Sequence, residues 1–249
     1  MNYLVHLFLA DDTPPSLLGN LMGDFVKGRL DDTFPAAIRR GIELHRQVDA
    51  FAHDNPLYRR SKSRLDDSYG YFRGVLIDIF YDHFLARNWH RYHPLPLEEF
   101  AARIYRLLEE HFELLPSGLQ QVAPRMIEHN WLLSYREVET IDRVLGRIST
   151  RLRRANPIGL GIAELHRNYA GLEADCDLFL AQAQEFARAW QGRAFREPSA
   201  LQGAATDWAA STSSLRNSAA WSPSAVGRTR RRSDPDPGWA VAAGRSASA

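Results

Sequence analysis

The chain has 249 residues, 45% of them hydrophobic and 24% charged, and a formal net charge of +1 at pH 7. This length allows one sizeable core or two domains, and no apolar run approaches the roughly 18 to 20 residues that a membrane-spanning helix needs. A charge this close to zero also disfavours a general nucleic-acid binder, because such proteins usually need a broad basic face.

The first expected element covers residues 2–10 and is an apolar helix with one histidine, His6. No basic residue precedes this stretch, and Asp11 and Asp12 follow it, so it does not match a secretory signal. A lone histidine on an apolar face is more often a hydrogen-bonded core residue than a metal ligand. Taken alone, His6 therefore favours a structural role.

Residues 16–28 form the second expected helix, which follows a break made by two prolines. Within it, Gly19 and Gly23 lack a side chain and would let another backbone or a substrate approach closely. The carboxylate of Asp24, directly after Gly23, is hard to place in a core. We therefore expect Asp24 to line a pocket.

The third expected helix, residues 34–53, carries His45 and Asp49 four positions apart. Side chains at this spacing lie on one helical face. A His and an Asp so placed are more often a hydrogen-bonded helix pair than two metal ligands. Both interpretations stay open on spacing alone.

The segment Phe72–Trp89, within an expected helix over residues 70–92, is apolar nearly all the way round yet carries Asp78, Asp82 and His83. Such a helix should be buried, and a buried carboxylate needs a partner. Asp78 and Asp82 share a face and repel each other unless a cation lies between them. His83 points about 100° further round the helix.

Together, the third helix and the segment after it could present acids and imidazoles to one point. Mixed carboxylate and imidazole ligands suit Mn, Fe, Mg or Zn, and a carboxylate-rich set favours the harder ions Mn and Mg. The sequence therefore predicts a metal site. The candidate ligands from these two helices are His45, Asp49, Asp78 and Asp82.

The remaining sequence favours further helices at 56–65, 96–115, 117–132, 134–154 and 160–191, separated by proline and glycine breaks. No alternating strand pattern competes, so we expect an all-α fold. Glycine-rich phosphate loops, CxxC pairs and GxSxG are absent. The single cysteine, Cys176, excludes an internal disulfide and fits a cytoplasmic location.

From Phe195 onward the sequence is rich in Ala, Ser, Gly, Pro and Arg. This composition buries too little apolar surface to offset chain entropy, so we expect residues 195–249 to form a disordered tail and residues 1–194 one helical domain. Residues 1–194 hold 24 Lys and Arg against 26 Asp and Glu, and the tail holds 7 against 4. The basic cluster at 228–232 is read as a solvated charge run, with contact to nucleic acid or acidic lipid as the alternative.

Four blocks of the sequence together resemble the acyl carrier protein phosphodiesterase family. They are NYLVHLFLA from Asn2, SLLGNLMGDFVKG from Ser16, GIELHRQVDAF from Gly41 and IDIFYDHFLARNW from Ile77. The blocks follow the family's order, and weaker similarity continues through WLLSYREVETI to about residue 190. The resemblance thus covers the expected helical domain and leaves the tail unexplained.

The resemblance implies an all-helical, HD-like metal phosphohydrolase fold. It implies hydrolysis of the phosphodiester that links 4′-phosphopantetheine to the serine of holo acyl carrier protein. It also implies a divalent metal, with Mn²⁺ preferred and Mg²⁺ or Fe²⁺ as alternatives. The metal residues implied are Asp24, His45, Asp49, Asp78 and Asp82, and the implied acid, base or water-orienting residues are His6, Asp24 and His83.

Two departures from the family pattern concern the site. Val5 stands where alanine is expected, and Phe8 stands where the family often has a histidine. None of the four blocks contains the adjacent His-Asp dipeptide of ordinary HD enzymes. The pairs His45 with Asp49 and Asp82 with His83 stand in its place, which leaves the ligand set open.

An acidic carrier protein as partner predicts a basic rim around the site. Several basic residues lie on or beside the helices that carry the candidate ligands: Arg39, Arg40, Arg46, Arg59, Arg60, Lys62, Arg64 and Arg73. Such a patch would speed encounter and fix orientation. A solvated helix surface explains any single arginine equally well.

Two other functions fit the same sequence. One is an HD-like phosphohydrolase that acts on a nucleotide or a small phosphate ester, for which the metal site would look alike. The other is a helical binding module whose acids and histidines are structural. Activation by a divalent ion separates the module from the enzymes.

Overall fold

A computed structural model describes residues 1–194, and the tail predicted at 195–249 lies outside the described residues. Residues 1–194 contain ten α-helices, four short 3-10 helices and no strand, which confirms the all-α prediction. The α-helices are α1 (Tyr3–Leu9), α2 (Pro14–Met22), α3 (Ala36–Asp54), α4 (Pro56–Arg64), α5 (Phe72–Arg87), α6 (Leu97–Glu110), α7 (Ser117–Glu128), α8 (Trp131–Ser134), α9 (Val138–Arg151) and α10 (Ile162–Ala194).

Helix α5 is buried at the centre of the fold, as its apolar surface predicts. Ile77, Phe80 and Phe84 are inaccessible to solvent, and the polar residues Asp82 and His83 are buried with them. Apolar side chains all round a helix need neighbours on every side. Helices α1, α4, α9 and α10 provide these neighbours.

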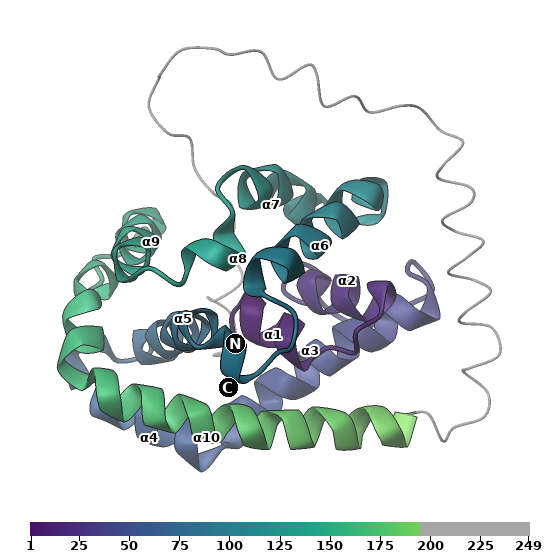
Figure 1. Cartoon of the computed structure of the whole chain (residues 1–249). Helices are drawn as coiled ribbons and strands as arrows, with labels where there is room; N and C mark the ends of the chain where they lie inside the picture. The colour runs from purple at the N-terminus through teal and green to yellow at the C-terminus, as the bar shows by residue number, and fades with distance from the viewer. Residues whose placement is uncertain (195–249) are drawn as a thin grey trace, which may run out of the picture.

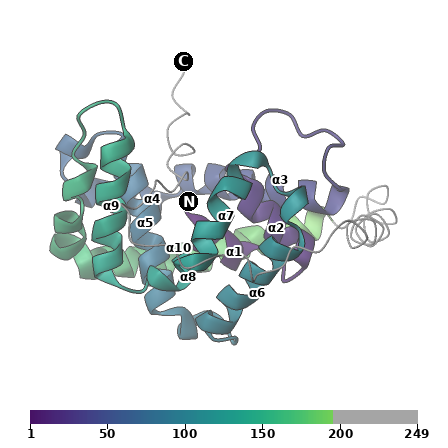
Figure 2. The ribbon, with the colours of Figure 1, turned by 90° about the horizontal axis from the view of Figure 1, so that it is seen from above.

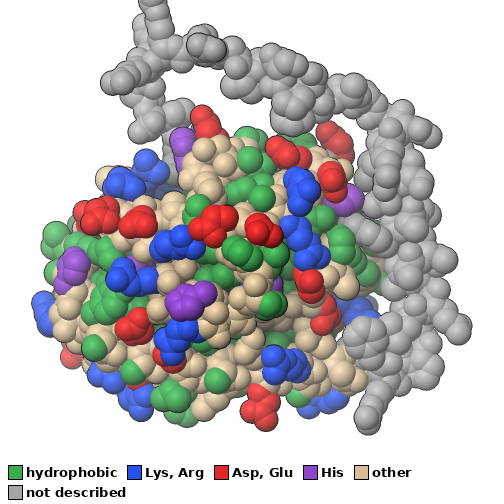
Figure 3. Space-filling model, viewed as in Figure 1, with side chains coloured by type: hydrophobic (Ala, Val, Ile, Leu, Met, Phe, Trp, Pro, Cys, Tyr) green, Lys and Arg blue, Asp and Glu red, His purple; other side chains and the backbone are tan. Residues whose placement is uncertain are grey.

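Helix α10 has 33 residues, runs across almost the whole molecule in Figure 1 and packs against α3, α4 and α5. It is long because no proline or adjacent glycines interrupt it. Neither α10 nor any other helix in residues 1–194 is long and apolar enough to cross a membrane. On the face seen in Figure 3, acidic and basic side chains are interspersed.

Helices α2 and α3 touch through glycines, as the sequence predicts for Gly19. A Cβ atom on Gly19 would lie 2.4 Å from the carbonyl oxygen of Ile38 and 2.7 Å from the Cα of Gly41. Neither position therefore has room for a side chain. This close crossing fixes α2 against α3 shortly before the candidate site residues Asp24 and His45.

Three of the expected helices are shorter or divided in the structure. The helix expected at 16–28 ends at Met22, and the following loop contains Asp24 and Gly28, whose φ is +79°. The helices expected at 117–132 and 134–154 are divided into α7, α8 and α9, because Asn130 takes a left-handed conformation with φ of 45°. Asparagine tolerates this conformation better than most residues.

Candidate functional site

A cleft of about 860 Å³ lies where five segments meet: the N-terminus, the loop after α2, helix α3, helix α4 and the first turns of α5. Figure 2 shows the chain beginning between α3 and α5. The candidate site residues that line the cleft are Asp24, His45, Asp49 and Asp78. Three of the four sequence blocks thus contribute candidate site residues to one cleft, and the first block contributes Asn2 and Tyr3.

The imidazole of His45 is held in a fixed orientation. Its Nδ1 donates to the carbonyl oxygen of Asn20 at 2.9 Å, so Nε2 faces Asp24 Oδ1 at 3.6 Å and Asp49 Oδ2 at 3.4 Å. A Cβ on Gly23 would lie 2.2 Å from the ring. Gly23 is therefore required for the ring to pass the end of α2, which is the close approach that the sequence predicts there.

His6 enters the same cluster from α1. Its ring stacks on the ring of His45, with centroids 3.6 Å apart. The side chain is 1% exposed, and its Nε2 lies 3.2 Å from Asp49 Oδ1, yet neither ring nitrogen makes a hydrogen bond. A hydrogen-bonded core histidine, the role that His6 favours in isolation, does not match this geometry.

Asp78 faces the cluster from α5 and is held by Tyr58, whose hydroxyl donates to Asp78 Oδ1 at 2.7 Å. The Asn55 side chain caps the start of α4 by accepting from the backbone of Leu57 and Tyr58, which fixes the position of Tyr58. The α-ammonium group of Met1 lies 2.7 Å from an Asp49 oxygen and 3.7 Å from an Asp78 oxygen. No sequence pattern indicates Tyr58 as a site residue, and only the helix start at Asn55-Pro56 marks its segment.

The cluster sets strongly different pKa values for its two histidines. Burial and the neighbouring charge of His45 lower the pKa of His6 to about 4. Burial also opposes the charged form of His45, but Asp24 and Asp49 outweigh it and raise the pKa of His45 to about 9. Despite burial, the Met1 ammonium group and the two histidines hold the pKa of Asp49 well below its usual range. At neutral pH the acids nearest the histidines are therefore ionised.

The donor set fits a divalent cation. His6, His45 and Asp49 each offer a ligand atom, and these atoms lie within 4.8 Å of one another. The buried ring nitrogens of His6 have no hydrogen-bond partner among residues 1–194, which a metal bond to one of them would partly remedy. His45 has the usual arrangement of a ligand histidine, in which one ring nitrogen donates to a backbone carbonyl and the other is left for the metal.

Asp82 lies outside this cluster, contrary to its predicted role as a ligand. Its two carboxylate oxygens accept the backbone N–H groups of Leu4 and Val5 at 3.0 Å each, and its side chain is 2% exposed. Burial raises the pKa of Asp82 to about 7. Asp82 therefore holds the first turn of α1, the helix that carries His6.

His83 is also outside the cleft. Its Nδ1 donates to the carbonyl oxygen of Tyr135 at 2.9 Å, and the hydroxyl of Tyr169 lies 3.0 Å from Nε2. Burial lowers the pKa of His83, so the ring is neutral and the hydroxyl donates to it. With both nitrogens hydrogen-bonded, His83 links α5 to α10 and to the end of α8 and is not among the residues that line the cleft, so its acid or base role stays a prediction.

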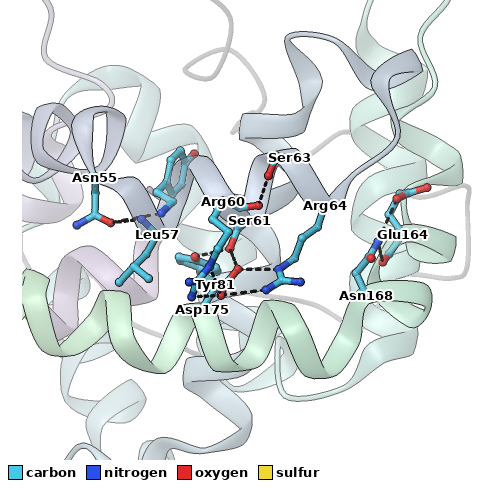
Figure 4. A network of polar contacts seen from close by, with 11 residues as sticks. Asn55, Leu57, Arg60, Ser61, Ser63, Arg64, Tyr81, Glu164, Asn168 and Asp175 are labelled. Carbon is cyan, nitrogen blue, oxygen red and sulfur yellow. Dashed lines mark hydrogen bonds and ion pairs between the residues drawn. The ribbon is translucent and has the colours of Figure 1, made fainter.

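Most of the predicted rim arginines are paired with acids. Figure 4 shows Arg60 and Arg64 of α4 directed at the Asp175 carboxylate on α10, with Nε to oxygen distances of 2.8 and 2.7 Å. Arg39 pairs with Asp32, and Arg59 with Asp54. Arg40 is not among the residues that line the cleft. The basic residues that do line it are Lys27, Arg46, Lys62 and Arg73.

A family model described as acyl carrier protein phosphodiesterase matches residues 1–183, which include every residue of the cleft. A relative with this name from Serratia proteamaculans is 32% identical over 76% of this chain and 98% of its own length. Relatives with the same name from Photorhabdus laumondii and Escherichia coli O157:H7 are also 32% identical, each over 70% of this chain and over 88% and 90% of their own lengths. No solved structure matches the chain.

Proposed function

We propose that this chain, which belongs to the acyl carrier protein phosphodiesterase family, hydrolyses the phosphodiester between 4′-phosphopantetheine and a serine of holo acyl carrier protein. The products are apo acyl carrier protein and 4′-phosphopantetheine. The observation that carries the proposal is that the ligand atoms of His6, His45 and Asp49 converge at the edge of a cleft that the family match covers. A cytoplasmic location agrees with this activity and with the single, buried cysteine.

A divalent ion would be held by His6 Nε2, His45 Nε2 and Asp49, with Asp24 and Asp78 as further oxygen donors. Mn²⁺ is our first choice, with Mg²⁺ and Fe²⁺ as alternatives, because the carboxylates suit Mn²⁺ and Mg²⁺ and the imidazoles suit Fe²⁺. When bound, such an ion neutralises charge on the phosphodiester and lowers the pKa of water. This matters because the negative charge of a phosphodiester repels an incoming nucleophile.

The chain's own residues prepare the cluster for this chemistry. The bond from His45 Nδ1 to Asn20 fixes the direction of Nε2, and a pKa of about 4 leaves His6 unprotonated at neutral pH. Asp24, whose side chain is 22% exposed, faces the same space and can accept a hydrogen bond from a water molecule. Tyr58 fixes one Asp78 oxygen and leaves the other directed at the cluster.

The reaction is a displacement at phosphorus. A water oxygen loses a proton and bonds to phosphorus, the bond from phosphorus to the serine oxygen breaks, and the serine oxygen takes up a proton, so the overall reaction moves one proton from water to serine. We assign the ionised carboxylate of Asp24 to orienting the water. His83, which the resemblance implies as an acid or base, makes two hydrogen bonds elsewhere and is assigned no part in this step.

The proposal is tested by incubating the purified chain with holo acyl carrier protein and Mn²⁺ and weighing the carrier by mass spectrometry. We expect the carrier to lose the mass of the phosphopantetheine arm. Asp49→Asn should remove this activity, and Asp142→Asn on the exposed face of α9 should retain it. A carrier unchanged with all three ions, or faster turnover of nucleotides or small phosphodiesters, would count against the proposal.

A further inference from the structure

Resting on the proposed function, we propose that Lys27, Lys62 and Arg46, together with the exposed ring of Tyr71, form a docking surface for an acidic face of the protein substrate. These residues line the same cleft as the metal cluster but come from different segments: the loop after α2, helix α4, helix α3 and the start of α5. The name "docking surface" is used below for these four residues.

The three cations of the docking surface differ from the other basic residues near the site. Within residues 1–194, Lys27, Arg46 and Lys62 make no ion pair. Arg46 donates to the carbonyl oxygen of Val26 at 2.9 Å, and Lys62 lies 5.1 Å from the centre of the Tyr58 ring. Arg39, Arg59, Arg60 and Arg64, by contrast, are each neutralised by an aspartate.

Unpaired cations at a cleft mouth create a positive potential that is not cancelled locally. The acids of the cleft do not cancel it, because Asp24 and Asp49 already interact with His45, and the α-ammonium group of Met1 lies beside Asp49 and Asp78. The cleft is thus divided into an acidic centre that suits a metal ion and a basic margin that suits an anionic partner.

Tyr71 adds an apolar contact to this margin. Its side chain is 93% exposed, the largest exposure of any aromatic residue reported for residues 1–194. It precedes α5 and follows Gly70, whose φ of +48° makes a turn that other residues resist. A large ring held out by a fixed turn beside a cleft is typical of an interface residue, because tyrosine is enriched at protein interfaces.

The spread of the docking surface favours a protein over a small anion. A single phosphate group would not need the exposed ring of Tyr71, whereas a folded acidic face can contact the ring and the three cations together while its modified residue enters the cleft. Nucleic acid is disfavoured because residues 1–194 hold fewer Lys and Arg than Asp and Glu, 24 against 26. Charge complementarity therefore selects an acidic protein.

The test uses the whole chain with Lys27→Glu and Lys62→Glu combined, and Tyr71→Ala separately. The matched control is Arg143→Glu with Arg147→Glu on α9, which changes the net charge equally at two exposed positions outside the cleft. Arg46 is left unchanged because it also supports the loop after α2. Circular dichroism confirms that each variant is folded.

We expect the double reversal to lower kcat/KM for holo acyl carrier protein by about tenfold or more at low ionic strength. The defect should shrink as salt is raised, because screening weakens the wild-type attraction. Apo carrier protein, which cannot react, should bind the double variant and Tyr71→Ala more weakly than wild type in calorimetry. The α9 control should match wild type in both measurements.

Three results would overturn the docking surface: apo carrier binding as tight as wild type in both variants, an equal loss in the α9 control, or a loss that does not change with salt. Tighter binding of a DNA duplex than of the carrier would reassign the surface to nucleic acid. If wild type hydrolyses the carrier while the variants bind normally, only the docking surface fails. If wild type neither binds nor hydrolyses the carrier, the proposed function fails as well.

Discussion

The rings of His6 and His45 stack with their planes 15° apart, although one belongs to α1 and the other to α3. Two charged imidazoles at this distance would repel each other, and the cluster avoids this by placing their pKa values at about 4 and about 9. His6 is therefore neutral and His45 charged at neutral pH in the absence of a metal. This difference in pKa should make metal affinity depend on pH.

Metal affinity should rise with pH. The pKa of His45 is raised, so below about 9 its Nε2 carries a proton that a metal must displace. Each binding event then releases at least one proton, and affinity should increase about tenfold per pH unit between about pH 6 and pH 8. Calorimetric titration with Mn²⁺ in buffers of different ionisation enthalpy measures this release. An affinity independent of pH would exclude His45 as a ligand.

Gly23→Ala should damage the site more than the fold. The new Cβ would lie 2.2 Å from the His45 ring, so the ring must move and its bond to Asn20 must break. We expect at least a tenfold loss of kcat, measured on holo acyl carrier protein. The control is Gly146→Ala on α9, where nothing lies within 4 Å of the added atom, and which should stabilise the protein by about 0.4 to 1 kcal/mol. Equal activity of both variants would show that the ring position is unimportant.

Asp78 and Asp82 should behave differently although they share a helix face. Asp82→Asn replaces one acceptor of a backbone N–H group with a donor, so unfolding should require about 1.5 to 3 kcal/mol less free energy. Asp78→Asn keeps an acceptor for Tyr58 and should leave stability nearly unchanged while weakening Mn²⁺ binding. Urea unfolding and metal titration of both variants check this. The reverse pattern would restore Asp82 to the metal site.

Asp175 should stabilise the fold without taking part in turnover. Its carboxylate is 1% exposed and accepts from Arg60, Arg64 and Ser61. Asp175→Asn should cost about 1 to 3 kcal/mol, a modest amount because both arginines can still reach water. The Tm should fall while kcat/KM of the folded protein stays the same. A salt-dependent loss of kcat/KM with an unchanged Tm would instead return Arg60 and Arg64 to partner binding.

The helical periodicity and the sequence blocks predicted the all-α fold and brought His45, Asp49, Asp78 and Asp24 to one place. Spacing could not separate Asp78 from Asp82. A spacing of four residues puts both side chains on one helix face, but it also separates them by about 6 Å along the helix axis. Asp82, the more buried of the two, contacts the start of α1. The partner of each carboxylate comes from a segment far away in the sequence, so the spacing of the two residues cannot predict it.

The same reason explains why the ion pairs of Arg60 and Arg64 could not be predicted from the sequence. Arg60 and Arg64 look like a free basic patch because Asp175, which neutralises them, is more than a hundred positions away in the sequence. His6 shows the opposite case. Alone it favoured a core role, and only the packing of α1 against α3 brings its ring to His45.

The most direct test of the central claim is hydrolysis of holo acyl carrier protein by the purified chain in water labelled with oxygen-18, with Mn²⁺ present. Attack of water on phosphorus predicts the label in the phosphate of the released 4′-phosphopantetheine and none in the carrier serine. Asp49→Asn should release nothing. Label in the serine, or a carrier that remains intact with Mn²⁺, Mg²⁺ and Fe²⁺, would contradict hydrolysis at phosphorus in this cleft.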